Sequence, residues 1–331
     1  MKRYLYLALF VILTGCTSTA QKYAVIGKII RLDPSLDSII LPDAKIEVIA
    51  EGMDWSEGPL WIEKEKMLLF SDVPRDTIFK WTEAKGKEVY LTPSGYTDTV
   101  KRGGEMGSNG LTLDNDGKLI LCQCGNRQIA RMDAPLNMPS AKYTPVANNY
   151  SGKKFNSPND VVVSSKGDTY FTDPPYGLEK NMADSKKEIP FQGVYMVSRD
   201  GQVILLTDTI TRPNGIVLMN DEKTLLIANS DPAKPYWYAF DLTDGKLSNG
   251  RIFYTAVSEK GEKGLPDGMK VDKAGNLFAS GPGGIWVFNK AGKLAGKIRV
   301  PEAASNCALS GDEKTLYITN DMNILRVKLR N

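Results

Sequence analysis

Oxygen-bearing side chains recur along this chain at intervals of roughly fifty residues, each near the start of a short apolar run. In chain order they are Glu57, Asn109, Asn159, Asn214, Asp267 and Asn306. Carboxylate and amide oxygens are ligands that Ca²⁺ accepts in forgiving geometry, whereas Mg²⁺ requires a tighter octahedron. If folding brings these side chains to one point, we expect a divalent-cation site. Ca²⁺ is the expected ion, with Mg²⁺, Mn²⁺ and Zn²⁺ as alternatives.

Three of these residues stand in tripeptides of one type, which are Pro158-Asn159-Asp160, Pro213-Asn214-Gly215 and Pro266-Asp267-Gly268. Proline fixes the approach of the chain, and Asn or Asp beside Gly tolerates unusual backbone dihedrals. A single copy would be explained by an ordinary β-turn. Three copies in register, together with Glu57, favour a shared site.

The composition excludes several chemistries. The 331 residues include no histidine, so Ser-His-Asp and Cys-His nucleophile systems and His-based zinc sites are absent. A general acid or base must then be a carboxylate, Lys, Tyr, Cys or metal-bound water. The formal net charge is only +3 and no basic stripe is present, so we expect no nucleic-acid partner.

The elements around these residues repeat as well. Each unit has a first apolar run, a polar turn, a second run and a third run, as in Asn214–Leu218, Thr224–Asn229 and Trp237–Phe240. A fourth run often follows, and no convincing amphipathic helix is present. Six such units predict an all-β fold, a six-bladed β-propeller of four-stranded antiparallel blades. The last unit has only three runs, and residues 45–50 are expected to supply its outer strand.

This fold would place the recurring oxygens together. The innermost strand of every propeller blade lines the central channel, and equivalent positions lie at the same height. The six residues at the start of the first runs are therefore expected at one mouth of the channel. A cation there would offset the cost of burying carboxylates and amides.

The N-terminus is typical of an exported lipoprotein. Lys2-Arg3 precedes an apolar run, and Leu13-Thr14-Gly15-Cys16 resembles the bacterial lipobox, in which the cysteine is lipidated. We predict a signal peptide over 1–15, a lipid-anchored tether and lead-in segment over 16–42, and the propeller over 43–331. Thr17 favours the outer membrane of a Gram-negative envelope. A plain signal peptide that happens to contain Cys16 is the alternative.

Several segments resemble the gluconolactonase branch of the SMP-30/gluconolactonase/luciferin-regenerating-enzyme family. They are Ser56–Trp61, Asn156–Val162, Tyr170–Gly177, Pro213–Gly215 and Pro266–Met269. The resemblance implies a six-bladed propeller with a central divalent cation, usually calcium, and hydrolysis of sugar lactones. It implies Glu57, Asn159, Asn214 and Asp267 as metal ligands, with Asp267 also as the acid/base residue. Asn109 and Asn306 are not standard ligands of the family and are expected to line the pocket or reach the metal through water.

One segment departs from the family pattern. Related gluconolactonases often carry Glu-His-Gly-Asn-Arg where this chain has Gln123-Cys124-Gly125-Asn126-Arg127. Asn126 and Arg127 remain substrate-binding candidates, because an arginine orients anionic or polyhydroxy ligands. Asp173 and Tyr176, in the loop after the second run of the third unit, are candidates for the pocket wall. A solvated surface arginine and ordinary turn residues are the alternatives.

The expected function is a calcium-dependent hydrolase that opens a sugar lactone such as gluconolactone to the aldonic acid. The metal would act as Lewis acid and Asp267, ionised with a depressed pKa, as general base. Action on another lactone, a glycoside or a phosphotriester is the first alternative. A non-catalytic propeller that binds sugar or protein is the second. The sequence leaves the oligomeric state and the particular lactone open.

Overall fold

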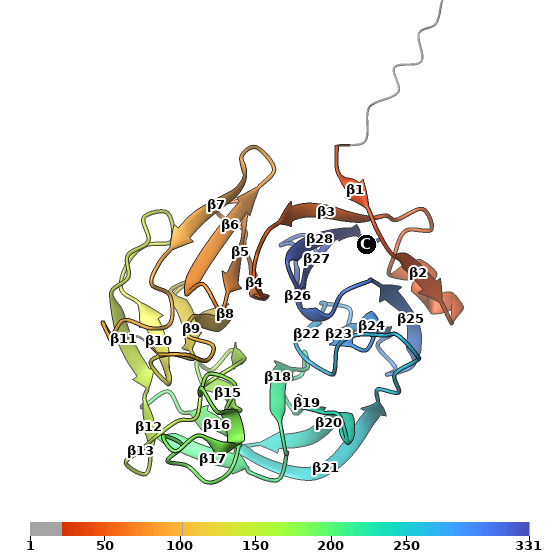
Figure 1. Ribbon diagram of the computed structural model, residues 1–331. Helices are drawn as coiled ribbons and strands as arrows, with labels where there is room; N and C mark the ends of the chain where they lie inside the picture. The colour runs from red at the N-terminus through yellow and green to blue at the C-terminus, as the bar shows by residue number, and fades with distance from the viewer. Residues whose placement is uncertain (1–21, 101, 331) are drawn as a thin grey trace, which may run out of the picture.

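The fold is a ring of β-sheets around a central axis (Figure 1), seen in a computed structural model that describes residues 22–100 and 102–330. The predicted signal peptide and Cys16 lie outside the described residues. The two helices in the described ranges are short 3-10 turns, η1 (Pro34–Ser38) and η2 (Asn181–Ala183). None of the described helices has the length and hydropathy needed to cross a membrane. The prediction of a six-bladed propeller is confirmed.

Each of the first three blades is a four-stranded antiparallel meander. From the axis outwards, blade I contains β4 (Ser56–Ile62), β5 (Met67–Asp72), β6 (Thr77–Thr82) and β7 (Gly86–Leu91). Blade II contains β8 (Ser108–Leu113), β9 (Leu119–Gln123), β10 (Gln128–Met132) and β11 (Tyr143–Ala147). Blade III contains β14 (Val161–Val163), β15 (Thr169–Asp173), β16 (Gly193–Val197) and β17 (Val203–Thr207). A small hairpin, β12 (Asn149–Tyr150) with β13 (Lys153–Lys154), lies between the last two.

The other three blades follow the same order, and two of them recruit strands from the N-terminal part of the chain. Blade IV contains β18 (Pro213–Leu218), β19 (Thr224–Asp231), β20 (Lys234–Thr243) and β21 (Lys246–Thr255). Blade V contains β22 (Met269–Val271), β23 (Leu277–Gly281), β24 (Gly284–Phe288), β25 (Leu294–Arg299) and β2 (Lys28–Arg31). Blade VI contains β26 (Ala304–Leu309), β27 (Thr315–Asn320), β28 (Asn323–Lys328), β3 (Ile46–Glu51) and β1 (Ala24–Val25).

The chain ends close the ring between them. Strand β3 pairs with β28, so the segment that precedes blade I supplies the outer strand of blade VI, as predicted. The segment expected to be tether and lead-in contributes more than that. Strand β1 adds to β3 and β2 adds to β25, so residues 24–31 belong to the propeller sheets. Pairing of these strands covers sheet edges that would otherwise be open.

The hydrophobic core is divided among the interfaces between blades. Within the described ranges, each of the six interfaces carries its own cluster of buried apolar side chains. The second strands explain this, since β5, β9, β15 and β23 are buried along their whole length and place apolar side chains on both faces of their blades. Cys122, Cys124 and Cys307 pack as small buried hydrophobes, because all three thiols are free and fully buried. Both faces of each blade are therefore sealed, and the blades converge on one axis.

Candidate active site

A cavity of about 410 Å³ opens at one mouth of the central channel, and loops of all six blades line it. Four of its lining residues are the predicted metal ligands Glu57, Asn159, Asn214 and Asp267. Two more are predicted pocket residues, Asn109 and Tyr176. Glu57, Asn109, Asn159 and Asn214 expose 5% of their surface or less, so their polar atoms face the cavity or the protein. The structure thus brings together side chains that are up to 210 residues apart in the chain.

Local irregularities of the innermost strands aim these side chains at the axis. The pairing of β4 with β5 shifts register between Glu57 and Leu60, and β18 with β19 shifts between Pro213 and Ile216. Such a bulge bends the strand and redirects a side chain. The backbone N–H of Gly58 then donates to Glu57 Oε2 at 2.9 Å, which fixes the carboxylate.

A glycine follows Glu57, Asn109, Asn214 and Asp267, and it permits close contact between neighbouring blades. At Gly215 a Cβ atom would lie 2.2 Å from the backbone oxygen of Asp267, so no larger residue fits. Gly58 shows the same restriction against the backbone of Asn109, and it also has a positive φ of 52°. From the sequence, Gly215 and Gly268 were expected to serve unusual turn dihedrals. The structure corrects this for Gly215, whose φ is not positive and whose role is the close approach of the next blade.

Where blade III has Asp160 in place of that glycine, a further carboxylate enters the centre. Asp160 is 3% exposed and accepts hydrogen bonds from the backbone N–H groups of Val161 and Ile216. Burial raises its pKa, and its charge acts in turn on Glu57 and Asp267. Sequence reasoning missed Asp160 because it read the position as part of a turn.

The carboxylates of the cavity repel one another in the absence of a cation. Burial raises the pKa of Glu57 to about 8, with Asp160 and Glu105 adding to the effect. Burial, and then the charge of Glu57, raises the pKa of Asp267 well above its ordinary value. Burial also raises the pKa of Glu105, a cavity residue that sequence reasoning missed, to about 7. These shifts apply to the site without a cation. The depressed pKa expected for a cation-bound Asp267 stays a prediction, since a bound cation would remove the repulsion.

These shifts predict how the stability of the metal-free protein depends on pH. Glu57 and Glu105 bind a proton more readily in the folded than in the unfolded chain. Their contribution is therefore complete below about pH 4.5 and is lost as the pH rises through about 7 to 8. We expect the Tm measured in EGTA to fall over this range. Glu105→Gln should reduce the fall, and a Tm that stays constant or rises would contradict the assigned electrostatics.

One acceptor oxygen in the cavity has no hydrogen-bond partner among the described residues. Asn214 Nδ2 donates to Ser230 Oγ at 2.8 Å, and Ser230 Oγ donates to the Pro266 carbonyl at 2.6 Å. This chain fixes the amide so that Asn214 Oδ1, which is buried, is left without a hydrogen bond. An orphaned buried oxygen is costly unless a ligand satisfies it. The donor set of two carboxylates and two amide oxygens therefore fits a hard divalent cation.

The acidic residues alone do not form a metal site. In the described ranges, no group of three or more Cys, Asp or Glu side chains is placed to hold a metal ion. Any cation in this cavity would thus depend on the amide oxygens of Asn159 and Asn214 as well as on the carboxylates.

Three predicted substrate residues, Asn126, Arg127 and Asp173, are not among the residues that line the cavity, and they make structural contacts instead. Arg127 donates to the carbonyls of Phe155, Lys186 and Lys154. The Asn126 amide bonds Gln123 and Thr97 and thereby ties a loop to its own blade.

Gln123 and Cys124, the departures from the family pattern, also make structural contacts. Gln123 Nε2 donates to the Ser94 carbonyl at 2.8 Å, and Cys124 Sγ donates to the Pro158 carbonyl at 3.3 Å. Both side chains are fully buried and neither lines the cavity. Gln123 and Cys124 therefore hold loops next to the cavity, Cys124 through the residue that precedes Asn159.

Asp173 caps a loop instead of forming the pocket wall. Its two carboxylate oxygens accept from the backbone N–H groups of Asn156 and Ser157, both at 2.8 Å. This loop leads directly to Asn159. Burial raises the pKa of Asp173 to about 7 against the effect of these two bonds. The residue positions a cavity residue without reaching the cavity.

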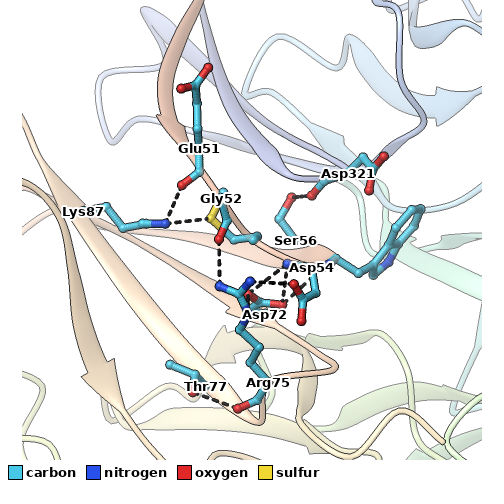
Figure 2. A network of polar contacts seen from close by, with 11 residues as sticks. Glu51, Gly52, Asp54, Ser56, Asp72, Arg75, Thr77, Lys87 and Asp321 are labelled. Carbon is cyan, nitrogen blue, oxygen red and sulfur yellow. Dashed lines mark hydrogen bonds and ion pairs between the residues drawn. The ribbon is translucent and has the colours of Figure 1, made fainter.

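The same device recurs at the end of the second strand in other blades. Figure 2 shows it in blade I, where Asp72 accepts from the backbone N–H groups of Asp54 and Trp55. Arg75 completes this network by donating to Gly52 and Asp54 (Figure 2). Trp55, which sequence reasoning missed, lines the cavity two residues before Glu57. A signal for these capping residues was present in the sequence, because the second runs of units I, III, IV and VI carry Asp or Asn at their ends.

We expect Asp173→Ala to lower the free energy of unfolding by about 2 kcal/mol, because two buried N–H groups lose their acceptor. Urea unfolding of the purified protein measures this. Asp208→Ala, at an exposed position in the same blade, is the matched control and should change little. Equal stability of the two variants would show that Asp173 does not act as a cap.

A comparison with protein families agrees with this geometry. The model described as "SMP-30/Gluconolactonase/LRE-like region" matches residues 55–321, which span the innermost strands of all six blades. The chain belongs to this family. The predicted resemblance is thereby confirmed, and the predicted signal peptide stays a prediction.

Individual family members extend the comparison. The chain is 39% identical over 329 residues to a gluconolactonase of Zymomonas mobilis, covering 96% of this chain and 91% of that protein. The solved gluconolactonase of Xanthomonas campestris superposes with a TM-score of 0.79 at 29% identity, covering 94% of this chain and 99% of that one. A calcium-binding regucalcin of Agrobacterium tumefaciens, 18% identical with a TM-score of 0.66 over 86% of this chain and 94% of that one, shares the fold.

Proposed function

We propose that this protein is a lactonase that opens a sugar lactone, such as gluconolactone, to the aldonic acid, and that it does so with a divalent cation, Ca²⁺, in the channel mouth. The observation that carries the proposal is the cavity in which Glu57, Asn159, Asn214 and Asp267 meet. Family membership and the gluconolactonase relatives supply the reaction class. The choice of Ca²⁺ rests on the oxygen ligands that the cavity offers, because the calcium-binding relative is similar to this chain in fold alone.

The cation would be held by these four residues, with the orphaned Asn214 Oδ1 as the clearest vacant donor. When bound, it supplies Lewis-acid polarisation of a carbonyl and neutralises the buried carboxylates. Asn109 lines the same cavity and is proposed to contact substrate. Asn306 supports the centre, because its amide interacts with Glu57 and Asp160.

Asp267 is proposed as the general base. It is partly exposed in the cavity, unlike the more deeply buried Glu57, so a water molecule can reach its carboxylate. Asp267 takes a proton from that water as the water oxygen bonds to the lactone carbonyl carbon. The bond from this carbon to the ring oxygen then breaks, and the ring oxygen leaves as an alcohol that receives the proton back from Asp267. One water is consumed and one hydroxy acid is formed.

The proposed activity is tested by pH-stat titration of the purified protein with a panel of sugar lactones in the presence of Ca²⁺. Release of one proton per lactone, above the spontaneous rate, supports the proposal. Identification of the open-chain acid by mass spectrometry confirms the product. If no lactone is opened faster than in buffer while the protein is folded, the proposal fails.

We propose in addition that the protein is exported and held in the bacterial cell envelope by a lipid on Cys16. Cell fractionation and mass spectrometry of the mature N-terminus test this. The wild-type chain should begin with an acylated Cys16 and remain with membranes, and Cys16→Ser should be released. An unmodified N-terminus at another residue would overturn the proposal.

A further inference from the structure

Arg212 stands at the cavity with its backbone firmly held. It directly precedes β18, and its N–H donates to Asn229 Oδ1 at 2.8 Å. Its carbonyl accepts from the N–H of Ser230 at 3.0 Å. Residues of β19 therefore hold both the N–H and the carbonyl of Arg212. Its partly buried side chain lines the cavity that also contains Asn214 and Asp267.

The guanidinium of Arg212 has no hydrogen-bond or ion-pair partner among residues 22–100 and 102–330. The nearby Asp231 is engaged elsewhere, accepting from Thr211 Oγ1 at 2.6 Å and from the backbone of Ala233 at 3.0 Å. Arg127, in contrast, donates to three backbone carbonyls and forms an ion pair with Glu188 at 3.3 Å. An arginine with five free donors in a cavity is a vacant site for an anion.

Arg212 is the one cationic residue among those that line the cavity, where Glu57, Glu105 and Asp267 are the acidic ones. A divalent cation would neutralise Glu57 and Asp267. The charge of Arg212 lowers the pKa of Asp231, so part of that charge is balanced within the protein. The hydrogen-bond donors of the guanidinium, which have no acceptor in the described ranges, are what a ligand would satisfy.

We propose that Arg212 is a specificity-determining residue that binds the carboxylate of a sugar acid. The planar guanidinium matches a carboxylate in a two-point contact, which a hydroxyl group does not reproduce. The inference rests on the proposed function, since opening a sugar lactone creates such a carboxylate. Two sources share this chemistry, namely the aldonate product and a lactone that already carries a carboxylate. Tyr176 and Trp55 line the same cavity and would flank the sugar carbons.

Binding of gluconate and of sorbitol, a neutral polyol of similar size, tests the inference by calorimetry on the calcium-loaded protein. We expect gluconate to bind at least about tenfold more tightly than sorbitol. Arg212→Gln should lose about tenfold or more in affinity for gluconate, with a smaller effect on sorbitol, and Arg212→Lys should be intermediate. Arg199→Gln, at an exposed turn of blade III, is the matched control. Circular dichroism and Tm establish that each variant is folded.

Kinetics separate the two sources of the carboxylate. If Arg212→Gln raises KM for a carboxylate-bearing glucarolactone more than for neutral gluconolactone, the arginine selects acidic substrates. If it relieves inhibition by gluconate without changing the KM ratio, the arginine holds the product.

The inference and the proposed function fail in different ways. Absence of lactone hydrolysis in a wild-type protein that binds gluconate through Arg212 would refute only the lactonase proposal. Normal hydrolysis with no gluconate binding, or with equal affinity in wild type and Arg212→Gln, would refute only the role of Arg212. An equal loss for gluconate and sorbitol would also overturn it, because the contact would then not depend on the carboxylate.

Discussion

Replacing Asp267 by Asn is expected to lower kcat for lactone hydrolysis by a factor of about 10³ or more, because the residue both removes the proton from water and belongs to the proposed cation site. The amide preserves the size of the side chain. It also removes one of two carboxylates whose charges oppose each other, since the charge of Glu57 raises the pKa of Asp267. The metal-free variant should therefore be at least as stable as the wild-type protein.

Initial rates by pH-stat and the Tm in EGTA measure both parts of this result. Asp241→Asn is the control, because it removes an acid of the same type from an exposed ion pair with Arg251 at 2.7 Å. The control should keep wild-type activity. A folded Asp267→Asn protein with activity within tenfold of the wild type would remove the assigned role.

Removal of the cation is expected to have the second largest effect, with loss of hydrolysis and a lower Tm. A ligand present at a hundred times its Kd and bound by the folded state alone stabilises it by about 2.7 kcal/mol. This corresponds to a rise of several degrees in Tm for a domain of this size. Asn214→Ala should reduce the rise, because it deletes the buried Oδ1 that lacks a partner in the metal-free structure.

The measured quantity is the difference between the Tm with added Ca²⁺ and the Tm with EGTA. Asn220→Ala provides the comparison. Asn220 lies in an exposed turn of the same blade as Asn214 and donates to the carbonyls of Asp272 and Lys273 in the next blade. Its Tm can fall, but the difference caused by Ca²⁺ should match the wild type. A wild-type Tm that does not respond to Ca²⁺ or to any other divalent cation would refute the metal site.

Much of the fold could be predicted because its pattern is local and repeated. Runs such as Thr224–Asn229 and Trp237–Phe240 carry their strand preference within a few residues, and six copies specify six blades. The outer strand from residues 46–51 followed from counting the runs of the last unit. The pairing of β1 and β2 could not be predicted, because two- and four-residue strands carry no periodic signal and depend on the edges they meet.

The site residues that stand at the repeated position of each unit could be predicted from the sequence. The roles of residues that depend on loop conformation could not. Asn159, Asn214 and Asp267 occupy equivalent positions, so one argument placed all three in the cavity. Asp173 and Arg127 have residue types suited to a pocket. In the structure, Asp173 instead accepts from a backbone N–H group, and Arg127 donates to a backbone carbonyl.

The sequence by itself determined the blade number and the five cavity residues that stand at the repeated position, because the spacing of the repeat fixes both. These five are Glu57, Asn109, Asn159, Asn214 and Asp267. Only the tertiary structure decided which polar side chains reach the cavity and which form hydrogen bonds that stabilise the loops around it. A side chain faces the cavity when its polar atoms have no nearer partner, and those partners come from loops distant in the chain. By this criterion Arg127, which donates to backbone carbonyls, is structural, whereas Arg212, which has no hydrogen-bond partner for its guanidinium in the described residues, lines the cavity.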